Sequence, residues 1–196
     1  MTRRIAVVAA GLGQPSSTRL LADQLAAATV RALGNSAVQV VELREHAHAL
    51  VDNMLTGFPA QDLGRAIDAV VRADGLIVVT PIFNASYSGL FKSFFDVLEP
   101  ESLEGKPVLI GATGGTARHS LAIDHAVRPM FSYLRAAPVP TGVFAATADW
   151  GDADSGLTGR IDRAAGELAN AIAGRQNSGP VDPFENPVSF EELLAR

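Results

Sequence analysis

The chain has 196 residues, 47% of them hydrophobic, which is enough for one domain with a full-sized core. Its net charge of −5 and its pI of about 5.3 argue against the basic surface typical of nucleic-acid-binding proteins. The absence of cysteine excludes disulfides, thiolate nucleophiles and thiolate metal sites. The first apolar run, 5–10, is too short to span a membrane and lacks a signal-peptide cleavage pattern, so we expect a cytoplasmic protein without membrane attachment.

Apolar runs typical of strands alternate along the chain with segments that show helical periodicity. The strand-type runs are apolar throughout, as expected for strands covered on both faces, and lie at 5–10, 38–43, 76–80, 107–112 and 139–145. The helix-type segments lie at 17–33, 62–73, 88–98, 120–135 and 158–174, and 44–58 fits either a short helix or a loop. Because parallel strands need crossover helices, this alternation predicts a doubly wound α/β fold.

The composition changes near residue 176. Residues 177–187 are rich in turn-forming residues and cannot continue a helix, and a capping-box pair, Ser189 and Glu192, follows them. We therefore predict a domain at 1–175 and a C-terminal arm at 176–196. The arm either packs on the domain or a neighbouring subunit, or is a frayed tail.

The loop after the first apolar run suits a phosphate. A phosphate binds backbone N–H groups, hydroxyl groups and the positive end of a helix. Three hydroxyls stand where the helix predicted at 17–33 begins, and a preceding glycine allows a tight turn. The candidate phosphate-binding residues are Gly11, Ser16, Ser17, Thr18 and Arg19.

Two other interpretations of this loop stay open. In the first, Ser17 or Thr18 is only a helix N-cap and Arg19 pairs with Asp23, which is the interpretation we favour for the arginine. In the second, the loop is a loose dinucleotide-binding fingerprint with Glu42 as a ribose ligand. Glu42 lies farther along the chain than the usual spacing of about 20 residues for that role.

Two further loops follow the third and fourth apolar runs. Because ligands bind beyond the carboxyl ends of parallel strands, we expect all three loops to converge. Apolar side chains after 76–80 suit one face of a planar ring, and we expect Pro81 to end that strand. Paired glycines after 107–112 give backbone N–H groups access to a ligand. The candidates are Pro81, Ile82, Phe83, Asn84, Ser86, Tyr87, Thr113, Gly114 and Gly115.

Core packing or a tight strand–helix turn is the alternative role for these residues. We interpret Trp150, in a loop after the last strand, as a packing anchor. No nucleophile–base pair, carboxylate pair or metal-ligand spacing stands out, so we name no catalytic residue and no metal ligand. That pattern fits an enzyme whose cofactor carries the chemistry.

The motifs in these loops resemble those of a known family. Residues 80–92, 113–124 with Arg128-Pro129, and 16–19 are similar to signatures of the flavodoxin-like NAD(P)H-dependent FMN reductases. The resemblance covers about residues 3–172 and looks closest to the branch that supplies reduced flavin to luciferase-like or sulfonate monooxygenases. Many relatives carry Tyr in place of Phe83 and a basic residue in place of Asn84.

The resemblance implies a flavodoxin-like, five-stranded parallel sheet with strand order 2-1-3-4-5. It implies FMN and NADPH or NADH as cofactors, with the phosphate on the first loop and the isoalloxazine ring between the second and third. It also implies a flavin-dependent monooxygenase as partner and a homodimer or homotetramer. The leading hypothesis is therefore an FMN reductase that exports reduced flavin. The alternatives are an FMN-retaining reductase of quinones, azo dyes or metal oxyanions, and a flavodoxin-type electron carrier.

Overall fold

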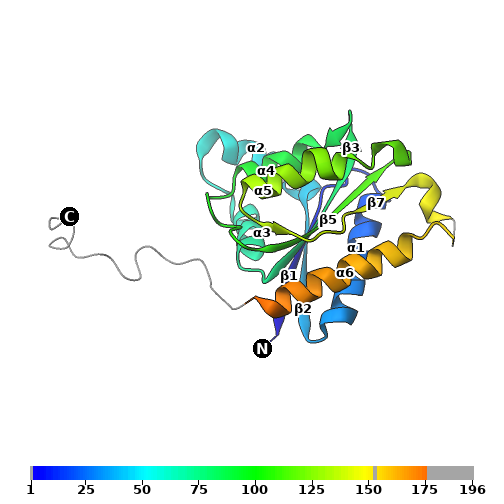
Figure 1. Ribbon diagram of the computed structural model, residues 1–196. Coiled ribbons are helices and arrows are strands. Elements are labelled where there is room, and N and C mark those ends of the chain that lie inside the picture. The colour runs from blue at the N-terminus through cyan, green and yellow to red at the C-terminus, as the bar shows by residue number, and fades with distance from the viewer. Residues whose placement is uncertain (1, 152–153, 176–196) are drawn as a thin grey trace, which may run out of the picture.

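The computed structural model describes residues 2–151 and 154–175 (Figure 1), and the predicted C-terminal arm, 176–196, lies outside them. The strands of the described part are β1 (Arg3–Ala9), β2 (Ser36–Glu42), β3 (Gly75–Phe83), β4 (Ser86–Tyr87), β5 (Pro107–Gly114), β6 (Ala137–Pro138) and β7 (Val143–Ala146). The α-helices are α1 (Ser17–Leu33), α2 (Ala47–Thr56), α3 (Gln61–Val71), α4 (Gly89–Asp96), α5 (Arg128–Tyr133) and α6 (Leu157–Gly174). The segment left open at 44–58 is thus a 3-10 turn, Leu43–His46, followed by α2.

One sheet joins the strands in the order β2-β1-β3-β5-β6, and β7 also pairs with β5. All pairs are parallel except β3 with β4. Numbered by position, this is the predicted flavodoxin-like order 2-1-3-4-5, which is confirmed. The predicted strand count is corrected, because the described sheet has seven strands rather than five.

The fifth predicted strand, 139–145, overlaps only β7, and β6 lies just before it, so residues 139–142 form a break between the two strands. Pro140 between them has no N–H for the ladder. The Arg128 guanidinium donates hydrogen bonds to the carbonyl oxygens of Val139 at 2.8 Å and Pro140 at 3.0 Å. Two carbonyl groups at the break are therefore paired with a side chain, while the Val139 amide still donates to the Val108 carbonyl of β5 at 2.9 Å.

The predicted end of the third strand at Pro81 is wrong, since β3 continues to Phe83. The Val79 carbonyl accepts from the Ala10 amide at 2.9 Å, so the backbone of Val79 faces β1. Pro81 is two residues later, so its backbone faces the same side, where β1 has already ended at Ala9. The missing N–H of Pro81 therefore costs no ladder bond.

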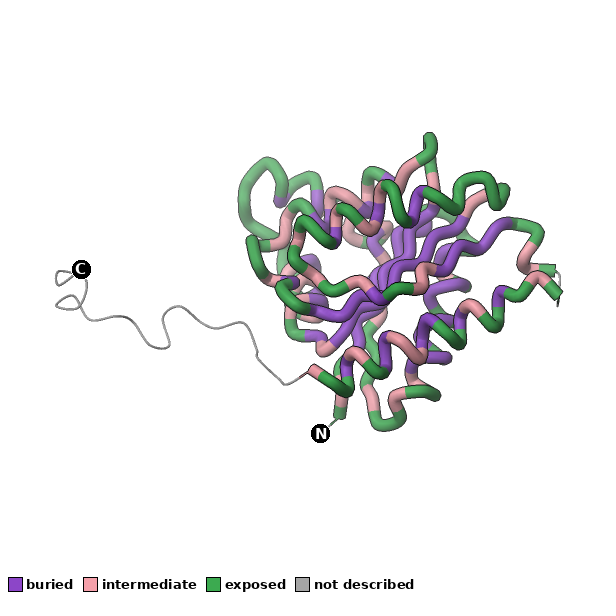
Figure 2. The backbone as a smooth tube through the Cα atoms, viewed as in Figure 1, coloured by how far each residue is buried: buried purple, intermediate pink, exposed green. Residues whose placement is uncertain are grey.

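Helices cover both faces of the sheet (Figure 1). On one face, α1 and α6 pack on strand residues such as Ile5 and Val7. On the other face, α2 to α5 pack on Ala6 and Val8. Figure 2 shows the buried strands running between these two layers. The alternation of side chains along β1 explains why its run is apolar at every position.

The helix predicted at 120–135 runs without interruption over 122–133 but is not α-helical throughout. A π-helical turn, Ile123–Val127, precedes α5, which carries Pro129 in its first turn. Because Pro129 has no N–H to donate to the preceding turn, the regular ladder stops before it. Among the described residues, no helix is long and apolar enough to cross a membrane.

Lys106 joins the start of β5 to the end of α3. The residue is 3% exposed, and its Nζ donates to the carbonyl oxygens of Val70 at 3.2 Å, Ala73 at 3.0 Å and Val71. These carbonyls lie where a helix leaves its last acceptors without intrahelical partners. Burial lowers the pKa of Lys106 to about 8.

Candidate functional site

The loops after β1, β3 and β5 meet at the carboxyl edge of the sheet around a cleft of about 390 Å³. This is the edge at which open α/β sheets bind ligands. The residues that line the cleft are Gly11, Leu12, Gly13, Pro15, Ser16, Ser17, Thr18, Pro81, Ile82, Phe83, Thr113, Gly114, Gly115, Thr147 and Trp150.

The first loop presents the start of α1 to the cleft. Ser16 is the N-cap, and its Oγ accepts a hydrogen bond from the Arg19 amide at 3.2 Å. A Cβ on Gly11 would collide with that same Oγ, so the tight turn requires glycine. Ser17, the first residue of the helix, is exposed beside these N–H groups. The loop therefore combines hydroxyl groups with the positive end of a 17-residue helix.

A buried hydrogen bond ties the first loop to the third. The hydroxyls of Thr18 and Thr113 lie 2.9 Å apart, and both residues are buried. Gly114 and Gly115 follow Thr113 directly and line the cleft. The hydrogen bond thus fixes the distance between the helix start and the glycine pair.

The second loop is a short hairpin rather than an irregular loop. Ile82 pairs with Tyr87 and Phe83 with Ser86 across a two-residue turn. Both turn residues, Asn84 and Ala85, have positive φ, which is the geometry of the turns that fit the twist of a hairpin. Phe83 is 46% exposed at the rim of the cleft.

The base of the hairpin is fixed to β3 and α4. The Ser88 amide donates to the Thr80 Oγ1 at 3.0 Å, and the Ser88 side chain caps α4 by accepting from the Phe91 amide at 3.2 Å. The Tyr87 ring lies 6.0 Å from the Phe91 ring, centroid to centroid. The hairpin is therefore held by the core rather than by solvent-exposed contacts.

The cleft brings together ten of the sequence-predicted site residues and leaves four outside its lining. Inside are Gly11, Ser16, Ser17, Thr18, Pro81, Ile82, Phe83, Thr113, Gly114 and Gly115. Outside are Arg19, Asn84, Ser86 and Tyr87. Asn84 lies in the hairpin turn, Ser86 and Tyr87 form β4, and Arg19 pairs with Asp23 and Glu42.

The sequence interpretation did not include five lining residues, Leu12, Gly13, Pro15, Thr147 and Trp150. Three of them belong to the first loop, which was predicted to bind phosphate, but they were not among its candidate binding residues. Trp150 packs against the core on the α1 and α6 side and also lines the cleft, so it combines packing with a place at the site. An aromatic side chain in a loop that follows a strand was the signal that could have identified it.

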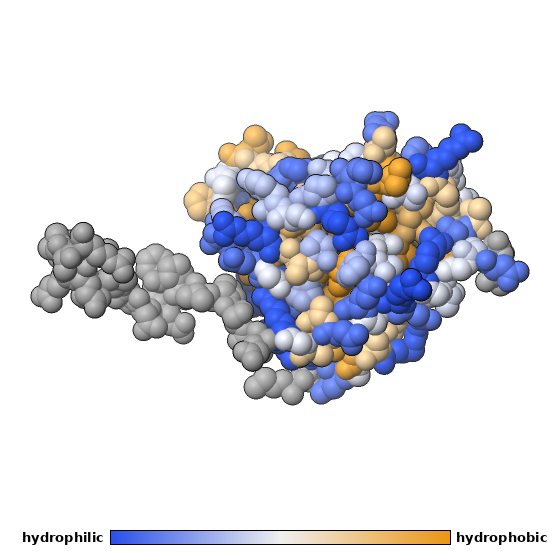
Figure 3. Space-filling view, viewed as in Figure 1, coloured by the Kyte–Doolittle hydropathy of each residue, from blue (hydrophilic) through white to orange (hydrophobic). Residues whose placement is uncertain are grey.

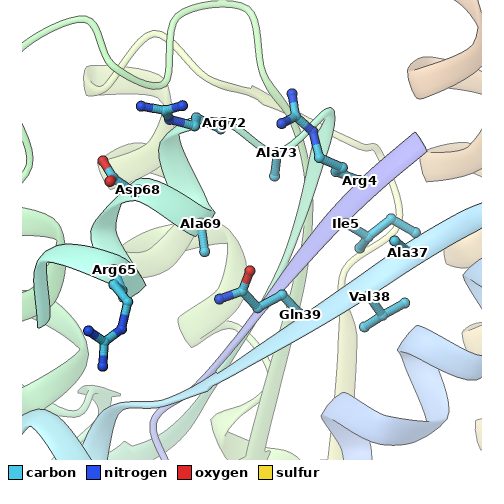
Figure 4. Close-up of a pocket in the computed structure, with 10 residues that line it drawn as sticks. All are labelled: Arg4, Ile5, Ala37, Val38, Gln39, Arg65, Asp68, Ala69, Arg72 and Ala73. Atoms are coloured by element: carbon cyan, nitrogen blue, oxygen red, sulfur yellow. The ribbon is translucent and has the colours of Figure 1, made fainter. Parts of the chain in front are cut away.

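A second cavity, of about 540 Å³, lies between β1, β2 and α3 (Figure 4). Three arginines surround it, and one of these, Arg65, pairs with Asp62. The cavity includes Arg4 and Ala37, close to the amino ends of their strands. It therefore lies away from the edge where the three loops meet, and we take the smaller cleft as the candidate site.

Comparison with known proteins decides the family. The family model described as NADPH-dependent FMN reductase matches residues 3–151. The chain belongs to this family. An FMN reductase (NADPH) of Pseudomonas aeruginosa is 35% identical over 175 residues, covering 88% of this chain and 94% of the relative. The NADH-dependent FMN reductase SfnF of Pseudomonas putida is 39% identical over 142 residues, covering 72% of this chain and 76% of SfnF.

Solved structures agree with the fold of an FMN reductase. A crystal structure of an oxidoreductase from Corynebacterium diphtheriae matches with a TM-score of 0.86 and 46% identity, over 89% of this chain and 99% of that one. The apo form of the NADH:FMN oxidoreductase EmoB matches with a TM-score of 0.81 and 28% identity, over 93% and 98% of the two chains. The family predicted from the loop motifs is thus confirmed.

Proposed function

We propose that this chain transfers hydride from NADPH or NADH to FMN and releases the reduced flavin to a flavin-dependent monooxygenase. The observation that carries the proposal is the cleft itself, in which a hydroxyl-rich helix start faces an apolar hairpin and a glycine pair. The family match supports the reaction class. A cytoplasmic location fits a reaction that consumes reduced nicotinamide.

The cleft residues fit FMN group by group. The phosphate suits the Ser16 and Ser17 hydroxyls and the free N–H groups at the start of α1, because a helix start favours an anion. The isoalloxazine ring suits the apolar side chains of Ile82 and Phe83 on one side. Backbone N–H groups at Gly114 and Gly115 suit its polar edge, since no side chain at Gly115 obstructs them.

Bound FMN supplies the hydride acceptor, and the protein supplies position. The hairpin and the third loop would hold the ring, and the hydrogen bond between Thr18 and Thr113 fixes the third loop relative to the helix start. Phe83 and Trp150 at the cleft would exclude water from part of the ring surface. Hydride transfer from nicotinamide to flavin needs no side chain as an acid or base, and the proposal therefore assigns none.

The lining of the cleft also supports export of the flavin. Among the lining residues in the described part of the chain, none is cationic. A phosphate that meets only hydroxyl and N–H groups lacks the stronger bonds that arginine gives. We therefore infer modest FMN affinity and release on the time scale of turnover, as delivery to a monooxygenase requires.

Steady-state NADPH and NADH oxidation with FMN varied as a substrate tests the proposal. We expect the rate to rise and saturate with added FMN, and the purified protein to be largely colourless. A flavin-dependent monooxygenase behind a dialysis membrane should still turn over. FMN that copurifies at full occupancy, with a rate unaffected by added FMN, would instead identify a flavin-retaining reductase.

An exposed apolar stripe supports a homo-oligomer. Val51, Met54 and Leu55 on α2 and Phe58 just beyond it are 51%, 47%, 81% and 81% exposed. The spacing of Val51, Met54 and Leu55 places them on one side of the helix, and Figure 3 shows apolar surface in the region of α2. Contiguous exposed apolar residues mark interaction surfaces. We propose that this stripe contacts a second copy of the chain.

Sedimentation measures this interface directly. The double variant Leu55→Glu/Phe58→Glu places two carboxylates on the stripe, so we expect it to sediment as a monomer at concentrations at which the native chain is a dimer or tetramer. Leu121→Glu, at another exposed apolar position, is the matched control and should retain the native mass. An unchanged mass in the double variant would place the interface elsewhere.

A further inference from the structure

Two arginines stand beside the phosphate-binding candidate loop, although neither lines the cleft. Both are paired with one carboxylate, Glu42, at the end of β2. Glu42 lies opposite Ala9 in the ladder, and Ala9 leads into the loop through Ala10. The carboxylate therefore lies close to the start of the loop and pairs with two arginines that could otherwise serve a phosphate.

The ion pairs around Glu42 form a continuous network. Glu42 Oε1 accepts a hydrogen bond from the Arg19 guanidinium, and its Oε2 accepts from Arg44 Nε at 3.3 Å. Arg19 Nε donates to Asp23 Oδ1 at 2.8 Å, on the next turn of α1. The Arg19 side chain is about one third exposed, so the pair is accessible from solvent.

The network also reaches the loop itself. In the amide orientation that satisfies both groups, the Gln14 side-chain oxygen accepts from Arg44 Nη1 at 2.9 Å. Gln14 lies between Gly13 and Pro15, which both line the cleft. Hydrogen bonding to Asp23, with added attraction from Glu42, raises the pKa of Arg19. The guanidinium is thus stabilised by carboxylates of the protein, and a phosphate must compete with them.

We propose that Glu42 limits the affinity for the FMN phosphate by holding Arg19 and Arg44 in ion pairs beside the loop. The proposal rests on the proposed function, because it assigns the phosphate to this loop. Arg19 follows the N-cap by three residues, and its amide already donates to Ser16 Oγ. Its side chain must leave Glu42 and loosen its hydrogen bond to Asp23 to approach an anion at the helix start. Glu42 is accordingly a positioning residue that favours flavin release.

The variant Glu42→Gln tests this step. It removes the one negative charge that the two arginines share and keeps the length of the side chain, while Arg19 still pairs with Asp23 and Arg44 with Glu45. We expect the Kd for FMN, measured by quenching of flavin fluorescence, to fall about tenfold, which corresponds to about 1.4 kcal/mol. The Kd for riboflavin, which has no phosphate, should change by less than about twofold. Asp62→Asn is the matched control, because it makes the same charge change at the remote Arg65 pair.

A double-mutant cycle distinguishes an effect of the released arginines from a general change in the electrostatic potential at the cleft. Arg19→Gln alone should change FMN affinity little, because Arg19 is already occupied by carboxylates. In the Glu42→Gln background, the Arg19→Gln replacement should remove most of the gain in FMN affinity. A gain that survives loss of Arg19 and of Arg44, an equal gain for riboflavin, or no gain at all would each overturn the proposal.

These outcomes do not depend on catalysis. If FMN fails to act as a substrate of NADPH oxidation, the proposed function fails, whatever the Glu42 variant does. If FMN is a saturable substrate and the Glu42→Gln variant binds it no more tightly, only the role of Glu42 fails. With the expected result, the variant should also retain FMN through gel filtration better than the native protein does.

Discussion

Replacing Ser17 with glutamate should weaken FMN binding by about 100-fold without loss of stability. Ser17 is the exposed first residue of α1, at the end of the cleft assigned to the phosphate. A carboxylate there repels the phosphate: two unit charges about 4 Å apart interact by roughly 4 kcal/mol near a protein surface. The same carboxylate suits the positive end of the helix and stabilises it by about 0.3–1 kcal/mol.

The opposite signs of the two effects make the Ser17→Glu experiment decisive. Thermal unfolding should show an unchanged or slightly raised Tm, and fluorescence titration should show the loss of FMN affinity. Ser17→Gln, which has the same shape and no charge, is the matched control and should bind FMN within about fivefold of the native affinity. Native FMN affinity in Ser17→Glu would place the phosphate elsewhere.

Thr18 is a poorer position for this experiment, and only the structure shows why. Its hydroxyl is buried and lies 2.9 Å from that of Thr113. A glutamate there would leave a charge without solvent and break the tie between two loops. In the sequence, Ser16, Ser17 and Thr18 are three equivalent hydroxyls. Capping, exposure and burial distinguish them only after the helix start is placed in space.

The strand order could be predicted because each strand carries its own local signal. Apolar runs bounded by turn formers identify buried parallel strands, and the helical segments between them require crossovers. The split between β6 and β7 depends on Arg128 supplying its hydrogen bonds to the backbone at the break. Arg128 lies 11 and 12 positions before the two residues it contacts, and no local sequence pattern predicts that contact.

The site was predictable to the extent that it is built from loops following strands. Ten of the residues predicted in the three loops line one cleft, as the topology of an open sheet requires. The role of Arg19 depends on Glu42, a residue of another strand that is 23 positions away. Sequence spacing pointed to Asp23 as partner, and the structure adds the second carboxylate. Long-range ion pairs of this kind follow from the register of β1 with β2 rather than from composition.

A substitution in the glycine pair of the third loop should also have a large effect on activity. Gly114 lies against the core, where an added Cβ would stand 2.9 Å from Phe144 Cζ. Replacing Gly114 would strain the core packing as well as the site, so a loss of activity in a Gly114 variant could not be assigned to either cause. Gly115 has nothing within 4 Å of an added Cβ, and its φ is not in the left-handed region. A side chain at Gly115 therefore has room to extend without displacing the protein.

Gly115→Leu should consequently abolish most FMN-dependent NADPH oxidation while Tm changes by less than about 4 °C, which corresponds to about 1 kcal/mol or slightly more in a chain of this size. The leucine side chain fills space beside Thr113 that the proposal assigns to the polar edge of the flavin ring, and it blocks the neighbouring backbone N–H groups. We expect KM for FMN to rise at least about tenfold. Gly159→Leu on α6, another position with open space around its Cβ, is the control and should retain native activity. Because an added Cβ has no protein atom within 4 Å at either glycine, a loss of activity confined to Gly115→Leu would support a flavin site at the third loop, and equal activity in the two variants would remove the third loop from that site.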